Sequence, residues 1–127
     1  MKKARKVNKY RSRFEETIAA DLRKRKVTFE YETLKLPFIQ PESKHIYKPD
    51  IILPNGIILE LKGKFDNQSR KKMALVMEQY KDKLDIRMVF MRNQPLQKGA
   101  KNTYGDWCNS RGVKWCVAPI PEEWINE

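Results

Sequence analysis

Residues 50–62 read Asp50-Ile51-Ile52-Leu53-Pro54-Asn55-Gly56-Ile57-Ile58-Leu59-Glu60-Leu61-Lys62. Two β-branched runs flank a Pro-Asn-Gly turn, which is the pattern of a β-hairpin. Two registers are open: a two-residue Asn-Gly loop sets Asp50 opposite Leu61, whereas a three-residue Pro-Asn-Gly loop sets Asp50 opposite Glu60. We expect the second. Pro, Asn and Gly suit the successive positions of a type I turn and its bulge, and this loop keeps proline out of the ladder.

In this register Asp50, Glu60 and Lys62 share one face of the hairpin. Directly opposed residues have Cβ atoms about 4.5–5.5 Å apart, and two carboxylates at that range repel unless a cation or proton lies between them. A hard divalent cation such as Mg²⁺ takes oxygen ligands of this kind. It would polarise a phosphodiester, and the neighbouring ammonium could stabilise the developing charge. The pattern therefore predicts a metal-dependent phosphodiesterase site.

The alternative is a surface salt bridge between Lys62 and either acid, which spacing alone leaves about equally open. The flanking isoleucine-rich runs favour the site, because polar side chains between buried segments need a partner.

A third acid is offered by the helix expected from Ser12 to about Lys26. Its apolar stripe is Phe14, Ile18 and Leu22. Glu15 falls at the edge of that stripe, whereas Glu16 faces solvent. The spacing favours Glu15 as the capping-box partner of Ser12, and a reach into the site is the alternative.

The other expected elements make one α/β domain over residues 1–127, with a mixed sheet flanked by helices. Residues 1–11 form a basic arm, and residues 37–49 form a linker or extended bridge. We expect strands at 27–32, 86–91 and 113–117, a helix from Ser69 to about Leu84, a short helix from Thr103 to Gly112, and a helical tail at 121–126.

Charge points to a polyanionic partner. Lys and Arg number 27 against 16 Asp and Glu, for a net charge of +11. Residues 1–26 carry 11 basic and 3 acidic side chains, whereas residues 27–66 carry 5 and 6. No apolar run is long enough to span a membrane. One histidine, His45, and two cysteines, Cys108 and Cys116, exclude a Cys/His zinc site and favour a cytosolic protein with free thiols.

The chain resembles a known family along nearly its whole length. The segments that carry the resemblance are Arg11-Ser12-x-Phe14-Glu15, Phe29-Glu30-Tyr31-Glu32, Tyr47-x-Pro49-Asp50, Leu53-Pro54-Asn55-Gly56-Ile57, Glu60-x-Lys62-Gly63, Arg70-Lys71-Lys72, Leu84-Asp85-Ile86-Arg87-x-Val89-Phe90, Tyr104-Gly105 and Ile120-Pro121-x-Glu123-Trp124-Ile125. Together they resemble endonuclease I of the T-odd coliphages, the phage enzymes that resolve Holliday junctions in DNA recombination.

The resemblance implies a restriction-endonuclease-like core of the PD-(D/E)xK type in a domain-swapped homodimer, exchanged through a bridge at residues 37–48. It implies Mg²⁺-dependent paired nicking of four-way and other branched DNA in the cytoplasm of an infected bacterium, with Mn²⁺ as a substitute metal. Asp50, Glu60 and the Leu61 carbonyl match the metal ligands, and Lys62 matches the catalytic lysine. Glu15 matches an acid that the partner chain donates to a second metal.

We expect DNA contacts from basic residues of the arm and the second helix: Lys2, Lys3, Arg5, Lys6, Arg11, Arg70, Lys71 and Lys72. Two other functions stay open. One is a sequence-specific or transposon-end nuclease with the same core, and the other is a basic DNA-binding protein without catalysis. Both cysteines and the three tryptophans, Trp107, Trp115 and Trp124, are expected to pack in the core or an interface.

Overall fold

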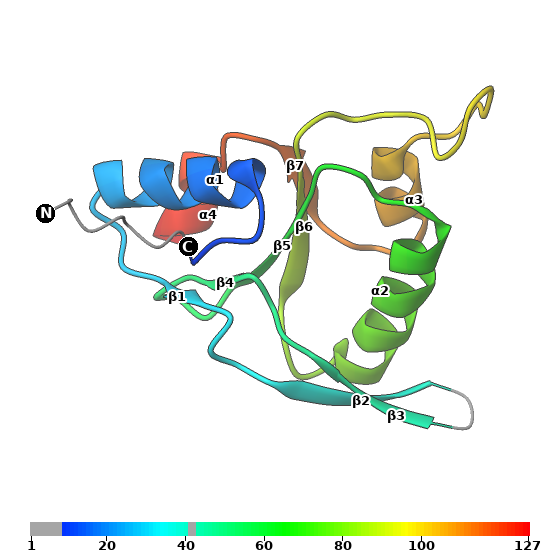
Figure 1. The fold of residues 1–127 in the computed structure, drawn as a ribbon, viewed down its shortest axis with the longest axis horizontal. Helices are drawn as coiled ribbons and strands as arrows, with labels where there is room; N and C mark the ends of the chain where they lie inside the picture. The colour runs from blue at the N-terminus through cyan, green and yellow to red at the C-terminus, as the bar shows by residue number, and fades with distance from the viewer. Residues whose placement is uncertain (1–8, 41–42) are drawn as a thin grey trace, which may run out of the picture.

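A mixed β-sheet forms the centre of the fold (Figure 1). The computed structural model describes residues 9–40 and 43–127. In chain order its elements are α1 (Arg13–Lys24), β1 (Glu30–Tyr31), β2 (Leu36–Gln40), β3 (Ser43–Tyr47), β4 (Ile51–Ile52), β5 (Ile58–Lys62), α2 (Asn67–Tyr80), β6 (Ile86–Phe90), α3 (Tyr104–Ser110), β7 (Trp115–Val117) and α4 (Glu122–Asn126). Within the described residues, the main sheet has the order β1-β4-β5-β6-β7, antiparallel from β1 to β5 and parallel from β5 to β7. The α/β class with a mixed, helix-flanked sheet is confirmed.

The hairpin of β4 and β5 forms with the predicted three-residue turn. The Leu53 N–H donates to the Ile57 carbonyl at 2.9 Å, and Gly56 closes the turn at φ +92°, a left-handed conformation that glycine adopts without strain. The strand pairing continues in this register, so Asp50 lies opposite Glu60. The register prediction is confirmed.

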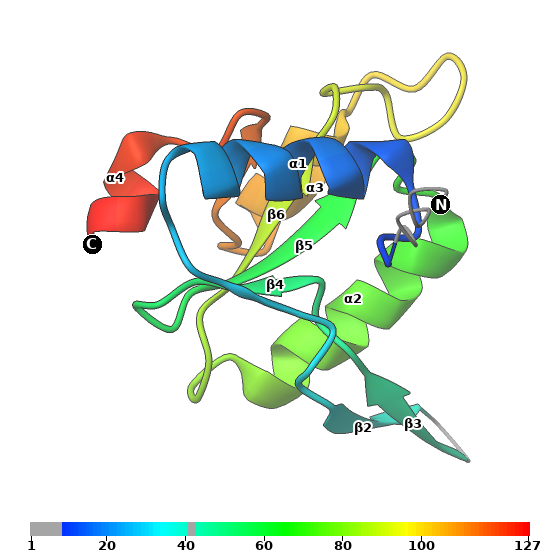
Figure 2. The same ribbon diagram turned by 60° about the vertical axis from the view of Figure 1, so that its left-hand side comes forward.

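Helices cover both faces of the sheet. In Figure 1, α1 and α4 lie on one side of the sheet and α2 and α3 on the other, and Figure 2 shows α1 passing across the strands. Side chains alternate between the two faces along β5: Leu59 and Leu61 pack with α1 and α4, whereas Ile58 packs with α2 and α3. The polar residues Glu60 and Lys62 alternate with them.

Helix α1 begins as predicted, because the Ser12 Oγ accepts the Glu15 N–H at 3.0 Å. Its predicted stripe, Phe14, Ile18 and Leu22, is buried. The helix ends at Lys24 rather than Lys26.

The largest differences from the expected bounds are in β1 and α2. The strand predicted over residues 27–32 is reduced to β1, which in the described part of the chain pairs only with the equally short β4 at the sheet edge. Helix α2 begins earlier than predicted because Asp66, not Ser69, is the N-cap. The Asp66 carboxylate accepts the Ser69 N–H at 2.9 Å, and the helix stops at Tyr80.

Residues 37–49, expected to form a linker or an extended bridge, contain β3 and most of β2. Strands β2 and β3 pair antiparallel as a separate two-stranded sheet. Leu36, Phe38 and Tyr47 point into the core beneath α2. The Tyr80 hydroxyl donates to the Pro37 carbonyl, so the backbone beside a proline is satisfied from the helix.

Near the C-terminus, the short helix predicted from Thr103 is confirmed. Thr103 and Asp106 form a capping box, and Gly112 follows the helix at φ +68°. Burial raises the pKa of the Cys108 and Cys116 thiols to about 12, so neither is a reactive thiolate at neutral pH. Across the described ranges, no helix is long and apolar enough to cross a bilayer.

Candidate active site

Three acids line up across adjacent strands of the main sheet. Glu32 follows β1, Asp50 precedes β4, and Glu60 lies within β5. The Glu32 N–H donates to the Asp50 carbonyl at 3.2 Å, which continues the β1–β4 register by one residue. Glu15 joins them from the first turn of α1. One carboxylate oxygen each from Glu15, Glu32 and Asp50 lies within 4.8 Å of the others, so this group could hold a metal ion.

Asp50 is the most deeply buried member of the group, with 1% of its surface exposed. Its Oδ2 accepts the Leu61 N–H at 2.9 Å. Its Oδ1 is buried and has no hydrogen-bond partner among the described residues. Burial, followed by the nearby Glu60 carboxylate, raises the pKa of Asp50 to about 8. An acid in this environment needs a proton or a cation.

Glu15 is also buried, and it serves both the helix and the site. Its Oε1 accepts the Tyr31 hydroxyl at 2.5 Å and the Arg11 N–H at 2.8 Å. The reciprocal half of the predicted capping box therefore goes to Arg11, one residue before the N-cap Ser12. Both readings of Glu15, as a helix-start residue and as a site acid, agree with its position.

Glu60 and Lys62 lie together as the alternation predicts. The Lys62 Nζ is 3.5 Å from Glu60 Oε2, and the Tyr47 hydroxyl donates to Glu60 Oε1 at 2.6 Å. Burial raises the pKa of Glu60, and the charge of Lys62 and the hydrogen bond from Tyr47 oppose that shift. Burial of Tyr47 and the charge of Glu60 raise the pKa of the Tyr47 hydroxyl well above its ordinary value. The hydroxyl therefore stays protonated and donates its hydrogen bond to Glu60.

Arg11 provides a positive charge at the rim of the acid group. Its Nε is 2.8 Å from Glu32 Oε2 and its Nη2 is 3.5 Å from Asp50 Oδ1. Both contacts are ion pairs, and neither Glu32 Oε2 nor Asp50 Oδ1 has a hydrogen-bond partner among the described residues. The Arg11 side chain is 68% exposed, so it can leave the acids without disturbing the core.

Sequence reasoning missed Glu32. The alternation in Phe29-Glu30-Tyr31-Glu32 is visible in the sequence, but nothing local says that β1 pairs with β4. Only that pairing brings Glu32 beside Asp50.

The model of the phage endonuclease I family matches residues 1–127. This chain belongs to the phage endonuclease I family. It is 43% identical over 124 residues to "Endonuclease I" of Escherichia phage T7, a match that spans 97% of this chain and 83% of that protein. It is 40% identical over 119 residues to "Endodeoxyribonuclease 1" of Enterobacteria phage T3, covering 93% of this chain and 78% of that protein. The family resemblance read from the sequence motifs is confirmed.

In this member of the phage endonuclease I family, the donor set suits a hard divalent cation. The candidate ligands are carboxylate oxygens, the atoms that Mg²⁺ and Mn²⁺ prefer. Asp50 Oδ1, which is buried and has no hydrogen-bond partner among the described residues, supplies a specific position that a cation would satisfy. The site residues therefore fit a metal.

The basic residues predicted to contact DNA have different surroundings. Lys2, Lys3, Arg5 and Lys6 lie outside the described residues. Arg70 is partly buried and donates to the Phe65 and Leu96 carbonyls, at 2.6 and 3.1 Å, so it holds the start of α2 in place. Lys71 and Lys72 are exposed, and Lys72 Nζ lies 5.6 Å from the centre of the Tyr47 ring.

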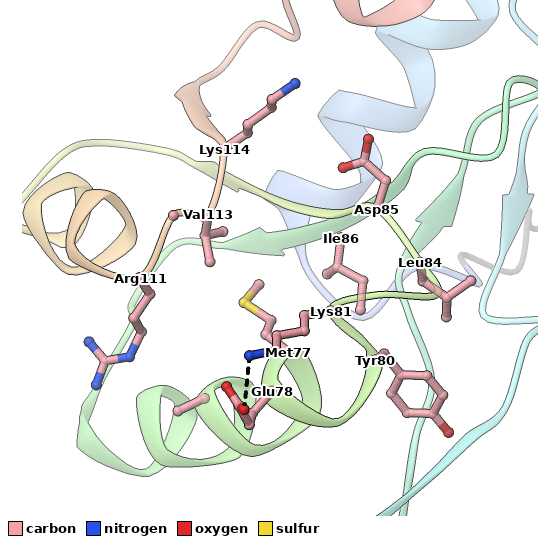
Figure 3. A pocket seen from close by; sticks show the side chains of 12 residues that line it. Met77, Glu78, Tyr80, Lys81, Leu84, Asp85, Ile86, Arg111, Val113 and Lys114 are labelled. Atoms are coloured by element: carbon pink, nitrogen blue, oxygen red, sulfur yellow. Dashed lines mark ion pairs between the residues drawn. The ribbon is translucent and has the colours of Figure 1, made fainter.

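A cavity of about 520 Å³ lies elsewhere in this family member. Figure 3 shows its lining from the last turns of α2, the start of β6 and the turn before β7, with the Glu78–Lys81 ion pair at its rim. None of the site acids lines it, so the candidate site is the acid group on the sheet and not this cavity.

Proposed function

We propose that this protein is a metal-dependent DNA endonuclease that nicks four-way junctions and other branched DNA, working in the cytoplasm of an infected bacterium. The observation that carries the proposal is the row of half-buried Glu32 and buried Asp50 and Glu60, with Glu15 and Lys62 beside it, in a chain of net charge +11. Support for DNA as the substrate comes from family membership and from the relatives' names, an endonuclease and an endodeoxyribonuclease.

The residues that would hold Mg²⁺, or Mn²⁺ in its place, are Glu15, Glu32, Asp50 and Glu60, together with the Leu61 carbonyl. When bound, the cation would polarise the scissile phosphodiester and lower the pKa of an attacking water.

The chain's own groups prepare the site for hydrolysis. The Leu61 N–H fixes Oδ2 of Asp50 and leaves Oδ1 without a hydrogen bond, 3.5 Å from the exposed Arg11 guanidinium. The Lys62 ammonium, beside Glu60, is available to stabilise negative charge that develops on the phosphate in the transition state. Exposed Lys71 and Lys72 offer contacts to neighbouring phosphates. These roles need no reading of base sequence, which is consistent with selection by branch shape.

The second part of the proposal is a homodimer in which residues up to the end of β2 are exchanged. Along the chain, α1 and β1 connect to the rest of the fold only through the β2–β3 hairpin. The outer face of this hairpin exposes two large apolar side chains, Ile39 (58%) and Ile46 (54%), which a second copy would cover. Exchange would keep every contact of Glu15 and Glu32 with Asp50, but across two chains. Two composite sites would then make paired nicks.

A labelled four-way junction tests the catalytic proposal. We expect paired nicks near the crossover with Mg²⁺, and none with EDTA, with Glu60→Gln or with Lys62→Met, whereas binding in a gel-shift assay persists in all three cases. Glu78→Gln and Lys81→Met are matched controls, because this pair lies on the surface of α2, and both should cleave normally.

Cleavage that survives Glu60→Gln would exclude the proposed site. Equal cleavage of an unbranched duplex, at defined sequences, would instead favour a sequence-specific nuclease of the same core. Binding without any cleavage by the wild-type protein would favour a non-catalytic DNA-binding protein.

A further inference from the structure

Tyr47 contributes a buried hydroxyl to the site, although it belongs to a different sheet. It ends β3, in the two-stranded sheet, and 1% of its surface is exposed. Its hydroxyl donates to Glu60 Oε1 at 2.6 Å, the length of a short charge-assisted hydrogen bond. Because the phenol is buried, that carboxylate oxygen meets its need for a partner.

The contact with Tyr47 limits how Glu60 can turn. One Glu60 oxygen accepts the Tyr47 hydroxyl, and the other lies 3.5 Å from Lys62 Nζ. The terminal torsion of a glutamate is otherwise broad. With a different donor beside each oxygen, the plane of the carboxylate is defined, and Oε2 remains the oxygen on the side of Lys62.

The ring of Tyr47 is itself held firmly. It packs in the core with Leu36, Phe38 and residues of α2, and Lys72 Nζ lies 5.6 Å from the ring centre. The position of the hydroxyl is therefore fixed by packing, and it fixes the Glu60 oxygen that it contacts.

We propose that Tyr47 is a positioning residue, whose hydroxyl orients the Glu60 carboxylate for a divalent cation and for Lys62. This inference rests on the proposed function, because it assigns Tyr47 a role at the same metal site. Groups that hydrogen-bond to metal ligands commonly alter metal affinity by 10–100-fold when they are removed.

The test is Tyr47→Phe, which removes the hydroxyl and keeps the ring. Mn²⁺ binding to the DNA-free protein is measured by electron paramagnetic resonance, and the Mn²⁺ and Mg²⁺ dependence of junction nicking is measured in parallel. We expect Mn²⁺ affinity to fall about 10–100-fold and the metal concentration for half-maximal nicking to rise to match. Saturating metal should recover most of the nicking rate.

Tyr80→Phe is the matched control. It also removes a tyrosine hydroxyl hydrogen bond, to the Pro37 carbonyl on the same hairpin, but this bond is exposed and, among the described residues, does not involve any of the acids. We expect it to lower the melting temperature of the protein and to leave Mn²⁺ affinity within about twofold of wild type. The melting temperature of both variants identifies any effect that comes from loss of folding, since a purely structural role would move stability and metal affinity together in both.

Wild-type Mn²⁺ affinity in a folded Tyr47→Phe protein that nicks junctions would overturn the positioning role and leave the nuclease proposal standing. A wild-type protein that neither binds Mn²⁺ nor nicks DNA would overturn both. Equal losses of metal affinity in Tyr47→Phe and Tyr80→Phe would assign the effect to the hairpin as a whole and also reject the inference.

Discussion

Glu32 and Asp50 are joined by a backbone hydrogen bond, from the Glu32 N–H to the Asp50 carbonyl at 3.2 Å, although the whole β2–β3 hairpin separates them in the chain. The hairpin leaves the main sheet after β1 and returns to it at β4, so two distant acids become neighbours. The acid group is therefore a product of strand pairing and does not follow from a local sequence motif.

Replacing Glu32 by glutamine should weaken the site. It removes one of the three carboxylates whose oxygens lie within 4.8 Å of one another. We expect Mn²⁺ affinity of the DNA-free protein, measured by calorimetry, to fall by about tenfold or more. Glu30→Gln is the control, because Glu30 is exposed and its carboxylate accepts the nearby Thr33 hydroxyl, away from the other acids. Equal affinities for Glu32→Gln and Glu30→Gln would show that Glu32 has no part in metal binding.

Stability without metal should decrease as the pH rises. Folding raises the pKa of Asp50 from 3.8 to about 8, so the folded chain holds this proton more tightly than the unfolded chain. The resulting stabilisation is fully present below about pH 4 and is lost as the pH rises through about 8.

The melting temperature in EDTA, recorded from pH 5 to pH 9, checks this expectation. The decline should be shallower in Asp50→Asn than in wild type, and Asp82→Asn, an exposed replacement, should follow wild type. Added Mg²⁺ should restore stability most at the alkaline end, where the carboxylate is free to bind it. Parallel curves for Asp50→Asn and wild type would contradict the assignment.

Arg11 should compete with a metal for the acids. Its guanidinium lies 2.8 Å from Glu32 and 3.5 Å from Asp50, so an incoming cation must displace it or share the carboxylates with it. We expect Arg11→Gln to increase Mn²⁺ affinity in the absence of DNA by roughly fivefold, the effect of removing one like charge at this range in a solvent-exposed setting. Arg13→Gln, an exposed replacement two residues further along the chain, should leave Mn²⁺ affinity unchanged. Unchanged binding in Arg11→Gln would show that Arg11 does not compete with the metal. Weaker binding would show that Arg11 supports the metal site.

Junction nicking by dimers that combine two different mutant chains tests whether segments are exchanged between the chains. In an exchanged dimer, co-expressed Glu15→Ala and Asp50→Ala chains would form one site with neither defect, and junction nicking should return to that site alone. Without exchange, each site keeps one defect and nicking stays absent. Co-expressed Glu60→Ala and Asp50→Ala chains are the control: both residues follow the hairpin, so neither arrangement restores a site.

Local chemistry explains which parts of the fold could be predicted. The register of β4 and β5 follows from three adjacent turn residues, Pro54, Asn55 and Gly56, and it carried with it the pairing of Asp50 with Glu60. The buried stripe of α1 and the helix start at Thr103 are local in the same way.

The errors come from competition between signals or from distant pairing. Asp66 and Ser69 are both good N-cap residues, and the earlier one caps the helix. The prolines and weak periodicity of residues 37–49 give no sign of the β2–β3 pairing, in which Pro37 takes part and its carbonyl accepts the Tyr80 hydroxyl. Glu32 could not be found because its neighbour in space depends on the β1–β4 pairing, for which the sequence gives no local sign.

The turn between β4 and β5 is also fastened to the last helix. Asn55 Nδ2 donates to the Trp124 carbonyl at 2.8 Å while its Oδ1 accepts the Ile57 N–H at 3.1 Å. Arg87, buried in β6, donates two hydrogen bonds to the Glu127 carboxylate, and its guanidinium lies 5.0 Å from the centre of the Trp124 ring. Helix α4 therefore stabilises the β4–β5 turn, which sets the alignment of Asp50 with Glu60. Substitutions near residue 124 can therefore disturb this alignment as the temperature rises, although α4 itself holds none of the site acids.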